Sequence, residues 1–227
     1  MTSSTRSRPT PSGARGQRDA AQRRQRLMMI GIGVLVVGLA IVVALTTTPS
    51  SDARVDLEDI VGSPQIEGEA LPAIPEDPST DPAIGALAPV VRGADFDGTP
   101  VAIGDTGTPQ LVAFLAHWCP ACEQELPEVA AWMDAGGLPD GVELVAVSSF
   151  QDPARPNWPP TDWFDREGFD GPILSDDADS SVMGSYGLSA TPSWAVLDAD
   201  GEVVLRLSGM VGAERLDALA ELALSSS

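Results

Sequence analysis

An α/β fold with a mixed central sheet is predicted for residues 89–227. Short apolar runs rich in Val, Ile and Leu alternate there with segments whose apolar residues recur at helical spacing. Turn sequences between some of the runs predict hairpins near both ends of this region. Strands that alternate with helices and hairpins build a mixed sheet covered by helices.

The strand signals begin with Pro89–Arg92 and Val101–Ile103, which flank Asp97-Gly98 and predict a hairpin. A second hairpin is predicted around the turn Asp198-Ala-Asp-Gly201. This hairpin joins the strands 193–197 and 202–207, and the strands outside the two hairpins are predicted from short apolar runs. In chain order after the first hairpin, the predicted strands are 110–116, 142–148, 173–174, 193–197 and 202–207.

Four helices are predicted. Apolar residues at helical spacing predict helices at 120–134 and 213–224. A short helix is expected at 162–167, and a helix capped by aspartate at 179–186. The first helix carries two prolines. Pro120 fits the first helical turn, where no backbone hydrogen bond is lost, whereas Pro127 lies inside the helix and should kink it.

A membrane anchor is predicted at residues 27–45, an uncharged run of 19 apolar residues long enough for a helix to cross a bilayer. Arg23, Arg24 and Arg26 precede it, so residues 1–26 are expected to form a disordered, basic cytoplasmic tail. The remainder then lies outside the cytoplasm, on a single-pass cell-membrane protein. The alternative is a cleaved signal peptide. Two features argue against it: the apolar run is longer than is usual for such a peptide, and no Ala-x-Ala cleavage site follows.

Residues 46–88 are predicted to form an extended tether, because they contain six prolines and nine acids against one arginine. Over residues 46–227 the chain holds 32 acidic residues and six arginines. Such a charge repels phosphate backbones and argues against a nucleic-acid partner. We expect a monomer that contacts the membrane through one helix.

The chemical signal is Trp118-Cys119-Pro120-Ala121-Cys122, at the junction of a predicted strand and helix. Unpaired amides at a helix N-terminus stabilise a thiolate, so Cys119 is the expected nucleophile and Cys122 the resolving thiol. An inert crosslink is the bland alternative, but so short a loop constrains the unfolded chain very little. A zinc site would need two more ligands, and we expect no metal and no cofactor.

With these residues in view, the chain resembles the thioredoxin-like, membrane-anchored thiol-disulfide oxidoreductases of the TlpA/ResA/CcmG (DsbE) type, over about residues 87–222. The resemblance rests on the string Phe-Leu-Ala-His-Trp-Cys-Pro-Ala-Cys-Glu-Gln-Glu-Leu-Pro, on the Asp-Gly of the first hairpin, on Tyr186-Gly187 and Thr191-Pro192, and on the second turn. It implies a thioredoxin-like fold with an N-terminal hairpin and an insertion at residues 150–178.

The resemblance also implies roles for single residues. Thr191-Pro192 would be a cis-proline loop that faces the cysteines and shapes the substrate groove, and Trp118 would belong to the docking face. Glu125 matches the family's acidic residue near the thiols, so we expect it to raise a thiol pKa and to accept a proton; the alternative is a solvated helix residue. Ala113 departs from the pattern, because classical thioredoxins have a buried aspartate there.

Four functions follow from these expectations. The leading one is an extracytoplasmic reductase of protein disulfides, including the cysteine pair of apocytochrome c, that takes electrons from a membrane thiol donor of the CcdA/DsbD type. The second is an oxidase that forms disulfides in exported proteins, coupled to a quinone-linked oxidase. A peroxiredoxin-like peroxidase and a copper-delivering protein are weaker alternatives. His117 could either tune the thiolate or have a structural role. Trp158 and Trp163 could either contact a partner or cover the sheet.

Overall fold

The computed structural model describes residues 61–226. The predicted tail and anchor, and the first part of the predicted tether, lie outside the described residues. Within residues 61–226, no helix combines the length and hydropathy needed to cross a bilayer.

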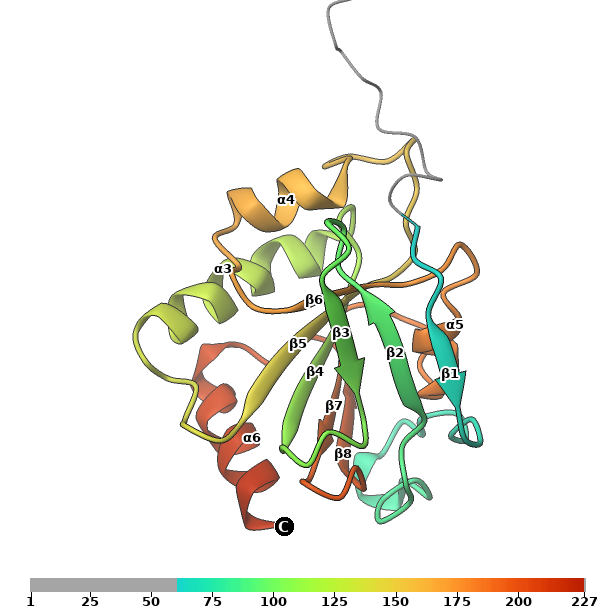
Figure 1. The fold of residues 1–227 in the computed structure, drawn as a ribbon. Coiled ribbons are helices and arrows are strands. Elements are labelled where there is room, and N and C mark those ends of the chain that lie inside the picture. Colours follow the sequence, from blue (N-terminus) through green and yellow to red (C-terminus); the bar gives the residue numbers. More distant parts are fainter. Residues whose placement is uncertain (1–60, 227) are drawn as a thin grey trace, which may run out of the picture. The chain divides into compact units, whose positions relative to one another are not determined.

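The described chain builds two sheets (Figure 1). The smaller one is antiparallel, with the order β1-β2-β3. The larger one is mixed and has the order β6-β5-β4-β7-β8, in which β4 pairs parallel to β5 and antiparallel to β7. The strands are β1 (Gln65–Glu67), β2 (Val90–Ala94), β3 (Pro100–Ile103), β4 (Gln110–Leu115), β5 (Glu143–Ser148), β6 (Ile173–Ser175), β7 (Ser193–Leu197) and β8 (Val203–Ser208).

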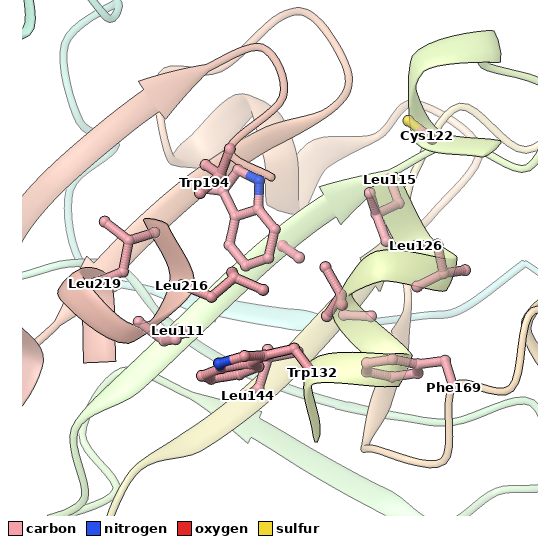
Figure 2. Close-up of a cluster of buried hydrophobic side chains, with 14 of the residues drawn as sticks. Leu111, Leu115, Cys122, Leu126, Trp132, Leu144, Phe169, Trp194, Leu216 and Leu219 are labelled. Atoms are coloured by element: carbon pink, nitrogen blue, oxygen red, sulfur yellow. The ribbon is translucent and has the colours of Figure 1, made fainter. Parts of the chain in front are cut away.

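Helices and the small sheet cover the two faces of the large one. Side chains alternate along a strand, so Leu111 and Leu115 of β4 face one core cluster while Val112 and Phe114 face the other. The first cluster includes residues of three helices; Figure 2 shows Leu126 and Trp132 of α3 and Leu216 and Leu219 of α6 in it. The second lies against β2, β3 and α5. The helices are η1 (Pro78–Thr80), α3 (Pro120–Asp134), α4 (Pro160–Arg166), α5 (Ser181–Ser185) and α6 (Ala213–Ser225).

The predicted strand–helix pattern is confirmed, and the mixed sheet with it. Both hairpins form, and Gly98 and Gly201 take positive φ at their turns, a conformation that costs glycine little. The helix predicted at 179–186 is shorter than expected. The residue at its start, Ser180, takes a left-handed conformation, and the carboxylates of Asp176 and Asp177 accept the first amides of α5.

The N-terminal segment departs from the predicted boundary at residue 89. Residues 61–88 are part of the fold: β1 pairs with β2, and Leu71 is buried with its amide bonded to Ser185 O. Asp81 lies 125 residues from Arg206 in the chain, yet the two form an ion pair in which both side chains are fully buried. The prediction of an extended tether was based on its prolines and its like charges. In the structure, however, the charge of Asp81 is neutralised by Arg206 of β8.

Candidate active site

Cys119 and Cys122 lie at the start of α3, where β4 delivers the chain to the sheet edge. Cys119 is the N-cap residue, and its Sγ accepts a hydrogen bond from the Cys122 amide at 3.4 Å. Cys119 is 7% exposed, whereas Cys122 has no exposed surface. Only the outer thiol therefore presents its sulfur to a second polypeptide, and both are free thiols in this structure.

The two thiols differ in acidity. Burial raises the pKa of Cys119, but hydrogen bonds from Cys122, from the Thr191 side chain and from the Ala121 amide outweigh it and leave the pKa below its ordinary value of 9.0. Burial raises the pKa of Cys122 far above that value, and the neighbouring Cys119 sulfur adds to the effect. At neutral pH the outer sulfur is thus the stronger nucleophile.

The Thr191-Pro192 bond is cis, as the resemblance implied. The loop faces the cysteines, although Thr191 lies 72 residues after Cys119 in the chain. The Cys119 thiol donates a hydrogen bond to Thr191 O at 3.3 Å. Trp118 is half-buried beside the nucleophile and its indole donates to Phe150 O at 2.7 Å. The structure thus brings Trp118 and the Thr191-Pro192 loop to Cys119.

Glu125 is fully buried, so its interpretation as a solvated helix residue is wrong. One carboxylate oxygen, Oε1, accepts the amide of Val211 and, at 3.2 Å, that of Gly212. Oε2 has no hydrogen-bond partner, and the Trp194 indole N–H, which favours the ionised carboxyl, falls short of hydrogen-bond geometry. Burial raises the pKa of Glu125, and the hydrogen bonds only partly offset it. The dominant influences on either thiol pKa do not include this carboxyl.

His117 is fully buried and directs both ring nitrogens into the segment that follows β5. Nδ1 lies 2.7 Å from Pro156 O, and Nε2 accepts the Asp152 amide at 3.3 Å. A carbonyl can only accept and an amide can only donate, so the ring is neutral with its proton on Nδ1. Burial lowers the pKa of His117, in agreement with the neutral ring. The structure therefore gives it a structural contact rather than one with the thiols.

The two tryptophans of the predicted insertion differ in position. Trp163 is fully buried in the cluster under α4, so it covers the sheet. Trp158 is half-buried and its ring meets the His117 ring edge-on at 5.6 Å. Sequence reasoning missed Arg155 and Asn157, which contact Trp118 and Glu123. No local pattern signals such contacts, since they depend on how this segment returns to the start of α3.

Comparison with known proteins agrees with this geometry. The family model described as Redoxin matches residues 83–215. The thiol-disulfide oxidoreductase ResA of Bacillus thuringiensis (strain Al Hakam) is 27% identical over 136 residues, which cover 59% of this chain and 75% of that protein. The sporulation thiol-disulfide oxidoreductase A of Bacillus subtilis (strain 168) is 26% identical over 121 residues, 53% of this chain and 72% of that protein.

A solved structure shows the fold. The chain matches a thiol:disulfide interchange protein of the thioredoxin family from Chlorobium tepidum TLS with a TM-score of 0.50 and 23% identity. The match covers 60% of this chain and 94% of that one. The predicted thioredoxin-like fold, with a mixed sheet flanked by helices, is confirmed.

Proposed function

Because the chain belongs to the Redoxin family, we propose that its thiol-disulfide oxidoreductase chemistry uses Cys119 and Cys122 and operates as a reductase of protein disulfides outside the cytoplasm. The observation that supports this most strongly is the unequal pair: an outer thiol at the N-cap of α3 with a lowered pKa, and a fully buried thiol one turn later.

The exchange proceeds in two steps. The Cys119 thiolate attacks one sulfur of the substrate disulfide, which forms a mixed disulfide and expels the other substrate sulfur as a thiolate. Cys122 then loses its proton and attacks the Cys119 sulfur, which releases the second substrate thiolate. Two electrons pass from the protein dithiol to the substrate, whose two sulfurs take up protons. The resulting Cys119–Cys122 disulfide must be reduced by an external dithiol.

The groups that stabilise the Cys119 thiolate support the reducing direction. A strongly oxidising pair has a reduced form stabilised by a very acidic thiol. Here hydrogen bonds at the start of α3 lower the pKa of Cys119 without a cationic side chain among the dominant influences, and burial opposes them. Cys122 is disfavoured as a thiolate by burial. The thiolate thus lacks a neighbouring cation as a source of extra stability, which favours the reducing direction.

The reduction potential tests this direction. We expect a value near that of thioredoxin, about −270 mV, when the full chain is equilibrated with thiol–disulfide buffers and the fraction of protein disulfide is measured. A value near about −120 mV would instead assign the chain to disulfide formation in exported proteins.

The surface around the nucleophile supports a proposal for the substrates. Trp118 and the Thr191-Pro192 loop flank Cys119 and would receive an extended polypeptide that carries a disulfide. We propose protein disulfides as the substrate class, with the cysteine pair of apocytochrome c among them. The external dithiol would be a membrane thiol donor of the CcdA/DsbD type.

The location is proposed from the N-terminal sequence. An anchor at residues 27–45, with arginines before it, places the oxidoreductase domain outside the cytoplasm as a single-pass membrane protein. Protease added to intact cells is expected to remove the domain. A domain protected from protease, or a mature N-terminus near residue 47, would contradict this topology.

Glu125 is proposed as the proton acceptor for Cys122 during resolution. It lies one helical turn after Cys122, and burial raises its pKa, so it takes up a proton more readily than an exposed carboxylate does. We expect Glu125→Gln to shift the thiol titrations and slow the resolving step while the fold is kept. Glu123→Gln is the matched control on the same helix. Thiol titrations of Glu125→Gln that superimpose on those of the wild type would remove Glu125 from the mechanism.

A further inference from the structure

The segment 150–158 is fastened to the residues that surround the nucleophile. Both ring nitrogens of His117 bond its backbone, at Asp152 N and Pro156 O. Asn157 donates at 2.8 Å to His117 O and at 2.8 Å to the Glu123 carboxylate in the first turn of α3. These contacts tie the segment to the chain on both sides of Cys119, so its position relative to the thiol is fixed.

Arg155 projects from this segment onto the residue next to the nucleophile. Its guanidinium carbon lies 4.7 Å from the centre of the Trp118 ring, a cation–π distance. The Trp118 indole in turn donates to Phe150 O, so two residues of the segment hold the ring. The Arg155 side chain is 55% exposed, and its Nε lies 3.5 Å from an Asp152 carboxylate oxygen.

That ion pair leaves the outer side of the guanidinium open. Within the described residues, no hydrogen bond or ion pair engages the two terminal nitrogens of Arg155. Two parallel N–H groups of a guanidinium match the two oxygens of a carboxylate. A planar donor pair is thus presented beside the residue that precedes Cys119.

The charge of the domain makes this position unusual. Residues 61–226 contain five arginines, and Arg206 is buried in its pair with Asp81. Arg166 bonds Asn157 and Glu167 within the same region of the fold. Among many acidic side chains, Arg155 is a positive charge that lies on Trp118, beside the nucleophile. An acidic substrate would be repelled by most of this surface. At this point Asp152 offsets part of the positive charge, and the two terminal nitrogens of Arg155 remain to bind a carboxylate.

We propose that Arg155 is a specificity-determining residue, whose guanidinium binds a carboxylate close to the disulfide of the substrate polypeptide. The inference rests on the proposed function, because it assigns a chemical preference to the substrates of that site. The ligand is an Asp or Glu side chain near the reactive cysteine, bound while the mixed disulfide with Cys119 forms.

The test compares two peptide disulfides that differ only in having Asp or Asn next to the attacked cysteine. The full chain in detergent should reduce the Asp peptide with a kcat/KM about two- to fivefold higher at low salt, the range of exposed ion pairs. High salt should remove the preference. Arg155→Gln should lose it, Arg155→Lys should keep part of it, and Arg215→Gln, which removes an exposed arginine of α6, should leave it unchanged.

The outcomes separate the inference from the proposed function. Equal rates of the wild type on both peptides would overturn the inference alone, as would an Arg155→Gln variant that slows both peptides by the same factor. The latter result would mean that Arg155 only packs on Trp118. If the wild type reduces neither peptide, the proposed function fails, and the inference fails with it.

Discussion

Asp81→Asn is expected to lower the free energy of unfolding by about 3–5 kcal/mol, because removing one partner of a buried ion pair leaves an uncompensated charge. Arg206 binds Asp81 through Nε at 2.9 Å and Nη2 at 2.5 Å, and both side chains have no exposed surface. The same guanidinium donates to Pro72 O and Tyr186 O. Urea unfolding should reveal the lower stability, and the segment 61–88 should detach from β8.

Glu76→Gln is the matched control, because it removes a charge from an exposed residue of the same segment and should change stability by less than about 0.5 kcal/mol. Burial raises the pKa of Asp81, but the Arg206 hydrogen bonds outweigh it and the pKa lies below its ordinary value of 3.8. The stabilisation is therefore present above that value and is lost as pH falls through the folded-state pKa. Equal stability of Asp81→Asn and Glu76→Gln would contradict this account of the N-terminal segment.

Cys119→Ser is expected to reduce disulfide exchange by at least about three orders of magnitude, since a serine hydroxyl is not ionised at neutral pH and does not form a mixed disulfide. The fold should survive, because Cys119 is an N-cap position and serine is a preferred N-cap residue. The measurement is the rate of peptide-disulfide reduction, with thermal unfolding as the check on folding. Substantial turnover by a folded Cys119→Ser variant would exclude this residue as the nucleophile.

Local patterns predicted most of the α/β architecture. The run at 110–116 is apolar on both sides because β4 is central in the sheet and packs against both clusters. The helix expected at 120–134 has these bounds in the structure, with Pro127 inside it. Where apolar periodicity and turn residues agree, the sequence is sufficient to place an element.

Long-range contacts were not predictable in the same way. The apolar residues of 61–88 show no clear strand or helix period, and Leu71, Ala83 and Ala88 reach the second core cluster only in the folded chain. Asp81 is held there by Arg206, a residue of β8 that looks locally like an ordinary strand position. His117 and Arg155 are similar cases, since their contacts depend on the return of residues 150–158 to the nucleophile. The cysteine pair was recognisable because its chemistry depends on the spacing of two residues close in sequence. The burial of Glu125 was not, because it depends on Val211, which is distant in the sequence.

Trapping of mixed disulfides tests the central claim, that Cys119 attacks and Cys122 resolves, most directly. The full-length Cys122→Ala variant should accumulate disulfide-linked complexes with substrate proteins that disappear on reduction, because the outer thiol still attacks and the resolving thiol is absent. Cys119→Ala, the matched variant, should trap none, since Cys122 is fully buried and its pKa is raised. Complexes that form through Cys122 in Cys119→Ala, with none in Cys122→Ala, would contradict the account.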